Sequence, residues 1–104
     1  MNRDELLRRV KDTIHEVEPG AEVILYGSRS RGDESSESDW DFLILVDGSV
    51  DDQRTDNIRH RLYEIEWELG EVLSSIVRDR TEWNSFPYRA TPFHQKVEGE
   101  GILL

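Results

Sequence analysis

The chain has 104 residues, a formal net charge of −10 and no cysteine. This length predicts a single domain over residues 1–104 with one modest core. The lack of cysteine excludes disulfide bonds and thiolate metal sites, and the acidic excess argues against generic nucleic-acid binding, which requires a basic face. No stretch approaches the roughly 20 apolar residues of a membrane span, and the charged start lacks the apolar segment of a signal peptide. A cytoplasmic protein without membrane contact is therefore predicted.

The first predicted element is a helix over residues 3–17. Apolar residues recur along it every three or four positions, which places them on one helix face. They are Leu7, Val10, Ile14 and Val17. Asn2 and Glu5 have the spacing of a capping box at the helix start, and Pro19 followed by glycine ends the helix.

Two predicted strands follow, separated by a charged loop. The β-prone run at 23–26 predicts a buried strand. Residues 28–38 are polar and predict a loop or at most one helical turn. Residues 40–46 are apolar except at Asp41, which is typical of a central strand covered by helices on both faces.

The second half of the chain predicts a helix over 51–69, a strand over 72–77 and a helical turn near 81–84. A short helix reaching about residue 98 and an edge strand at 102–104 complete the order. Strands that alternate with helices in this way predict an α/β (α+β) fold, with a small mixed β-sheet flanked by helices.

Asp39 and Asp41 form the first candidate functional group. Residues two positions apart in a strand point to the same face, with Cα atoms about 6.6 Å apart, so the two carboxylates lie side by side. Trp40 between them points into the core. Two carboxylates this close repel unless a cation lies between them, and oxygen ligands of this kind suit Mg²⁺.

A candidate phosphate-binding turn precedes them. Gly27 allows a ligand to approach the backbone closely, and Ser28 offers a hydroxyl and an N–H. Arg29 and Arg31 carry guanidinium groups that donate paired hydrogen bonds to phosphate. A phosphate-binding turn on one strand and a carboxylate pair on the next favour phosphoryl or nucleotidyl transfer.

The stretch GSRSRG followed by SDWDFLILV resembles the signature of the minimal nucleotidyltransferase family, within the DNA polymerase beta superfamily. That signature is a hydrophobic residue with Gly and Ser, a spacer, and then Asp-hydrophobic-Asp-hydrophobic. It matches here at Tyr26-Gly27-Ser28 and at Asp39-Trp40-Asp41-Phe42. The family's usual first part reads Gly-Ser-x-Ala-Arg-Gly, and Ser30 replaces the alanine here.

The resemblance implies a minimal nucleotidyltransferase fold and a Mg²⁺-dependent reaction. A nucleoside monophosphate, usually AMP from ATP, would be transferred to a hydroxyl. Gly27 and Ser28 would hold the triphosphate, while Asp39 and Asp41 would ligate one or two Mg²⁺ ions. Many such small proteins are antitoxins that adenylylate a tyrosine on an all-helical HEPN toxin, which implies a HEPN-type partner.

The family's third carboxylate, on the following strand, has no evident counterpart. Ser74 or Ser75 occupies the expected acidic position, and Glu71 stands at the start of that strand as a possible substitute. Without a third acid, a second metal ion would be held poorly. The alternative is therefore a weak or inactive nucleotide-binding module that acts as an antitoxin by protein–protein binding. Transfer to a small molecule is a further alternative, although known enzymes of that sort carry an extra helical domain.

Histidines and aromatic residues outside the motif predict structural roles. His15 and His94 lack partners at metal-ligand spacing, and both are expected at the surface. Tyr63, Trp67 and Trp83 are predicted to be core or interface aromatics, because no basic residues interleave with them as in single-strand binders. The sequence leaves the oligomeric state open, and a homo-oligomer remains possible.

Overall fold

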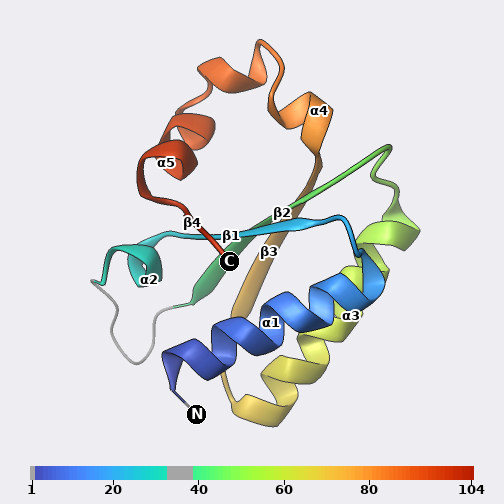
Figure 1. Cartoon of the computed structure of the whole chain (residues 1–104), viewed down its shortest axis with the longest axis vertical. Helices are drawn as coiled ribbons and strands as arrows, with labels where there is room; N and C mark the ends of the chain where they lie inside the picture. Colours follow the sequence, from blue (N-terminus) through green and yellow to red (C-terminus); the bar gives the residue numbers. More distant parts are fainter. Residues whose placement is uncertain (1, 33–38) are drawn as a thin grey trace.

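A four-stranded mixed sheet forms the centre of the protein (Figure 1). The computed structural model describes residues 2–32 and 39–104. Its elements in chain order are α1 (Arg3–Val17), β1 (Glu22–Tyr26), α2 (Ser28–Arg31), β2 (Trp40–Val46), α3 (Asp52–Leu69), β3 (Leu73–Asp79), α4 (Arg80–Trp83), the 3₁₀ helix η1 (Tyr88–Ala90), α5 (Pro92–Glu100) and β4 (Ile102–Leu103). The strand order is β3-β2-β1-β4; β2 and β3 run parallel, whereas β1 pairs antiparallel with both β2 and β4. The mixed sheet with flanking helices is the predicted fold class.

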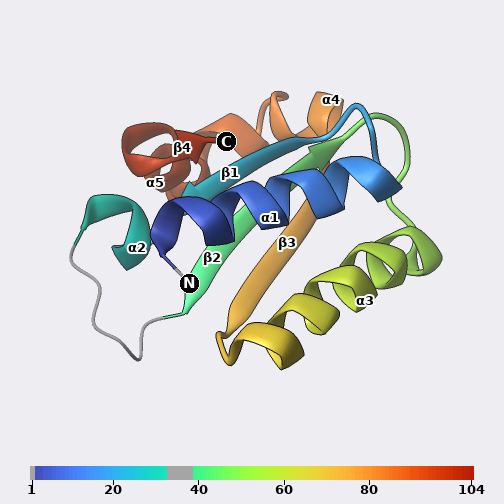
Figure 2. The same ribbon diagram turned by 60° about the horizontal axis from the view of Figure 1, so that its bottom comes forward.

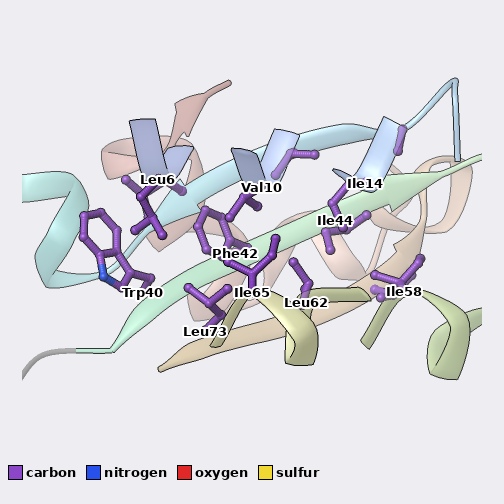
Figure 3. Close-up of a cluster of buried hydrophobic side chains, with 14 of the residues drawn as sticks. Leu6, Val10, Ile14, Trp40, Phe42, Ile44, Ile58, Leu62, Ile65 and Leu73 are labelled. Carbon is purple, nitrogen blue, oxygen red and sulfur yellow. The ribbon is translucent and has the colours of Figure 1, made fainter. Parts of the chain in front are cut away.

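Helices cover both faces of this sheet, as Figure 2 shows with α1 and α3 on one side and α4 and α5 on the other. Successive side chains of a strand point to opposite faces. Phe42 and Ile44 therefore pack against α1 and α3 (Figure 3), whereas Leu43 and Leu45 pack on the side of α4 and α5. This two-sided burial is why β2 is apolar at nearly every position.

Helix α1 begins at Arg3, as the sequence predicts, and α3 begins at Asp52, one residue later than predicted. Asn2 caps α1, because its Oδ1 accepts a hydrogen bond from the Glu5 N–H at 2.9 Å. Asp51 caps α3 in the same way, accepting from the Arg54 N–H at 2.8 Å. No helix within residues 2–32 and 39–104 has the length and apolar character needed to cross a membrane.

Residues 28–31 form the one-turn helix α2, the upper limit of what the sequence predicted for that loop. Gly32 ends this helix, and residues 33–38 of the predicted loop lie outside the described residues. The third strand runs over Leu73–Asp79, slightly later than predicted. The last helix continues through Gly99 to Glu100, two residues beyond the predicted end.

The prediction that His94 is a surface residue is wrong. Its side chain is buried, with 5% of the residue exposed, and it stacks on Trp83 with ring centroids 4.4 Å apart. The cause is tertiary, because α4 and α5 pack around the same aromatic cluster. Trp83 is a core residue, while Tyr63 and Trp67 are 62% and 84% exposed on α3 and contribute little to the core.

Candidate active site

Asp39 and Asp41 stand together at the start of β2. Asp39 directly precedes the strand and Asp41 is its second residue. Asp41 is paired in register with Tyr26 on β1 and with Ser74 on β3. The Ser74 hydroxyl lies 3.5 Å from Asp39 Oδ2, so both carboxylates lie on the face of the sheet that also carries Leu43.

Gly27 connects β1 to α2 and lies against Asp41. Its backbone angles are φ 81° and ψ −163°, a region that is essentially restricted to glycine. A Cβ added to Gly27 would stand 2.5 Å from Asp41 Oδ2. The predicted phosphate-binding turn and the predicted metal ligand are therefore in direct contact, and the backbone conformation of Gly27 requires glycine.

The surroundings of Asp41 disfavour the ionised form of its carboxyl group. Burial raises the pKa of this carboxyl most, and the negative charges of Asp39 and Glu100 raise it further, while the positive charge of Lys96 lowers it. A group whose neighbours are mostly negative gains stability when a cation binds. Two carboxylates on one face suit Mg²⁺, which keeps part of its shell for water and phosphate oxygens.

Within the described residues, no set of three or more metal-ligating side chains surrounds this position. Among residues 2–32 and 39–104, the side chains at this position that could hold Mg²⁺ are those of Asp39 and Asp41. This donor set fits one ion that completes its coordination with water and a nucleotide.

The parallel register decides which residue occupies the third carboxylate position. Ser74 is the partner of Asp41 and shares its face, whereas Ser75 is the partner of Phe42 and lies on the opposite face. Glu71 is also directed away from the aspartates, because its Oε2 accepts a hydrogen bond from Trp40 Nε1 at 3.1 Å. The suggestion that Glu71 replaces the third acid is thus not supported, and Ser74 takes that position.

Arg29 lies on the side of β2 opposite to Asp41. Its guanidinium stacks over the Trp40 ring at 4.3 Å from the ring centre, and its Nη2 is 3.9 Å from Glu71 Oε2. The residue is only 8% exposed, and Arg3 Nη1 donates to its carbonyl oxygen at 2.6 Å. Arg29 is placed to hold α2 against β2 and α1. Its predicted contact with a nucleotide stays a prediction that this placement does not favour.

Arg31 and Ser30 link α2 to the last helix. Arg31 Nη1 donates to Glu100 Oε2 at 2.6 Å, and the Ser30 hydroxyl lies 3.3 Å from the same oxygen. That hydroxyl also donates to the Gly27 carbonyl at 2.6 Å. Ser30, which replaces the alanine of the usual family motif, therefore stabilises the turn that begins at Gly27. Ser28 follows Gly27 as the first residue of α2.

Two residues of α5 near the site were missed by sequence reasoning. Glu100 binds α2, and Lys96 carries a charge that acts on Asp41. Both follow the Asp pair by more than fifty positions, and no motif marks them. The one available signal was that Lys96 is one of only two lysines, the other being Lys11.

Tyr26 adds a polar group beside Asp41. Its ring packs edge-on against Phe93 of α5, with centroids 5.3 Å apart. Burial and the charge of Asp41 raise the pKa of the Tyr26 phenol. The phenol therefore stays protonated at neutral pH and remains a hydrogen-bond donor in this region.

Comparisons with known proteins agree with this geometry. The family model described as "Nucleotidyltransferase domain" matches residues 6–98. No curated protein matches the sequence. Among solved structures, a toxin–antitoxin complex with AMP-PNP matches with a TM-score of 0.67 and 18% identity, covering 92% of this chain and 69% of the other.

Two structures of mutants of the toxin–antitoxin pair MntA–HpeT are also similar. They have TM-scores of 0.60 and 0.61 at 16% and 20% identity, and the similarity covers 99% and 100% of this chain and 72% of each matched chain. At these identities the likeness concerns the fold. The family match covers most of the chain, and the Gly-Ser turn and Asp pair lie within it. The chain therefore belongs to the nucleotidyltransferase-domain family of the DNA polymerase beta superfamily.

Proposed function

We propose that this protein is a Mg²⁺-dependent nucleotidyltransferase that transfers AMP from ATP to a hydroxyl group. The observation that carries the proposal is the contact between Gly27 and Asp41, with Asp39 on the same face. It brings a backbone turn suited to phosphate next to a carboxylate pair suited to a metal ion. Neither feature has an evident structural purpose there, since the paired negative charges and the glycine-only backbone both reduce stability.

Gly27 and Ser28 bind the triphosphate, and Asp39 and Asp41 hold Mg²⁺. When bound, the ion neutralises phosphate charge and orients the reacting phosphate. The acceptor oxygen forms a bond to the α-phosphorus, the bond from that phosphorus to the β-phosphate oxygen breaks, and pyrophosphate leaves with the electron pair. The acceptor proton passes to water, because the Ser74 hydroxyl is not a base at neutral pH.

The proposed acceptor is a hydroxyl on a partner toxin of the HEPN type, with this chain as the cytoplasmic antitoxin. The similar solved structures are toxin–antitoxin assemblies, and one contains the ATP analogue AMP-PNP.

The test is transfer of label from α-³²P-ATP, with Mg²⁺ present, to a HEPN-type toxin if one is encoded by the gene next to this one. Wild type should label the toxin, and Asp39→Asn and Asp41→Asn should each abolish labelling. Asp56→Asn on the exposed surface of α3 is the matched control and should label normally. Absence of label with wild type, or undiminished label with both active-site variants, would exclude the proposed catalysis.

A second candidate is a non-catalytic antitoxin that neutralises its toxin by binding. The observation that favours it is Ser74, which occupies the position beside Asp41 where the family carries a carboxylate. The two candidates separate in a growth assay with the toxin expressed. Neutralisation that survives Asp39→Asn with Asp41→Asn supports binding alone, and neutralisation lost in that variant supports catalysis.

A further inference from the structure

Helix α5 lies next to α2 and the end of β1, the two elements that flank the Gly-Ser turn (Figure 1). The carboxylate of its last residue, Glu100, accepts a hydrogen bond from Arg31 and lies 3.3 Å from the Ser30 hydroxyl. Phe93 near its start packs on Tyr26. These contacts fasten both ends of α5 to the segments that carry the Gly-Ser turn.

Lys96 lies one helical turn before Glu100, and residues four apart share a helix face. Its side chain is exposed. Its positive charge acts on Asp41, where it opposes the effects of burial and of Asp39. Within the part of the chain that the structure describes, no carboxylate lies within ion-pair distance of the Lys96 ammonium.

The other basic residues near the turn are already engaged. Arg29 stacks on Trp40 on the opposite side of β2, and Arg31 binds Glu100. The segment 33–38 contains no lysine or arginine. A nucleoside triphosphate carries several negative charges, and a chain with a net charge of −10 needs local positive charge to bind it.

We propose that Lys96 is a ligand for the polyphosphate of the nucleotide, supplied by α5 across from Asp39 and Asp41. This assignment rests on the proposed nucleotidyl transfer and adds a phosphate-binding residue outside the Gly-Ser and Asp-x-Asp motif. A lysine ammonium suits this purpose, because it is a mobile point charge with three donors. Glu100 has a positioning effect, because it joins α5 to α2 one helical turn after Lys96.

The first experiment is lysine acetylation of the full chain, with and without saturating ATP and Mg²⁺, read by mass spectrometry. The chain contains only two lysines, so Lys11 on α1 is an internal control. ATP should reduce acetylation of Lys96 severalfold and leave that of Lys11 unchanged. Equal acetylation of Lys96 with and without bound ATP would overturn the assignment.

The second experiment compares ATP and AMP affinities by calorimetry for wild type, Lys96→Gln, Lys96→Arg and Lys11→Gln. Loss of one charged hydrogen bond to phosphate predicts about tenfold weaker ATP binding in Lys96→Gln, with AMP affinity nearly unchanged. Lys96→Arg should restore most of the ATP affinity, and Lys11→Gln should match wild type. An equal loss for ATP and AMP, or no loss for either, would contradict the proposal.

These measurements also separate two kinds of failure. If wild type binds no nucleotide at all, the proposed function itself is wrong. If wild type binds ATP and transfers AMP while Lys96→Gln keeps the wild-type ratio of ATP to AMP affinity, only the assignment of Lys96 is wrong.

Discussion

Asp41 Oδ2 lies 2.5 Å from the point at which a side chain on Gly27 would begin. The carboxylate thus occupies space that only a glycine leaves open. The same relationship places the proposed phosphate-binding turn against the strand that carries the proposed metal ligands. It makes Gly27 the most sensitive glycine of the site.

We expect Gly27→Ala to destabilise the protein by about 3 kcal/mol, since it combines a backbone conformation disallowed for alanine with a clash against Asp41. Gly70→Ala is the matched control. Gly70 also has a positive φ, of 70°, but an added Cβ meets nothing within 4 Å, so a cost of about 1 kcal/mol is expected. Urea unfolding followed by circular dichroism measures both. Equal costs for the two variants would show that Asp41 does not crowd Gly27.

Asp41→Asn should stabilise the metal-free protein at neutral pH. Burial and neighbouring negative charges raise the pKa of Asp41 in the folded state, so the native protein binds more protons than the unfolded chain between the unfolded and the folded pKa. The free energy of unfolding therefore falls as pH rises through that window. In Asp41→Asn this decrease is absent.

The measurement is urea unfolding in EDTA at several values between about pH 4 and pH 7. The stability difference in favour of Asp41→Asn should grow with pH. If Asp41→Asn were less stable than wild type at pH 7, the prediction would be wrong, because the folded protein would then stabilise the negative charge of Asp41.

Ser74→Asp should strengthen Mg²⁺ binding and raise the rate of transfer, because the parallel register places residue 74 beside Asp41. Added Mg²⁺ stabilises a folded protein according to how far its concentration exceeds the dissociation constant, by about 2.7 kcal/mol at a hundredfold excess. The Mg²⁺-dependent rise in melting temperature should therefore appear at lower concentrations in this variant.

Ser75→Asp is the control for this prediction. Residue 75 lies on the opposite face, beside Phe42, so its carboxylate cannot join the aspartates. Its Mg²⁺ dependence should remain that of wild type. If both variants, or neither, changed the Mg²⁺ dependence, residue 74 would not be the third ligand position.

Trp67→Ala should change the free energy of unfolding by less than about 0.5 kcal/mol, since the side chain is 84% exposed. Trp83→Ala should cost about 3–5 kcal/mol, because Trp83 is only 2% exposed and packs against Phe93, Tyr88 and His94. Chemical unfolding of the two variants gives the comparison. A large loss in Trp67→Ala would mean that the exposed indole is covered within the folded protein.

Much of the fold was predictable because its signals are local. The apolar spacing of α1 and α3, the capping residues Asn2 and Asp51, and the unbroken apolar run of β2 each reflect the geometry of a single element. The Gly-Ser and Asp-x-Asp spacing is local as well, and for this reason the amino-acid sequence is sufficient to locate the candidate site. Local patterns do not predict where a long side chain points, because that depends on residues of other elements.

Arg29 shows this limit clearly. Its position beside Gly27 and Ser28 predicts a phosphate ligand, yet its guanidinium stacks on Trp40, which belongs to the next strand. His94 is similar, because only the packing of α4 against α5 buries it.

By itself, the sequence determined the family, the order of helices and strands, and the residues of the Gly-Ser turn and the aspartate pair. Only the tertiary structure decided that Ser74 and not Ser75 lies beside Asp41, that Glu71 is directed elsewhere, and that Glu100 of α5 binds Arg31 of α2. The physical reason is that strand register and helix docking are determined by core packing across the whole chain. These long-range contacts choose which side chains meet.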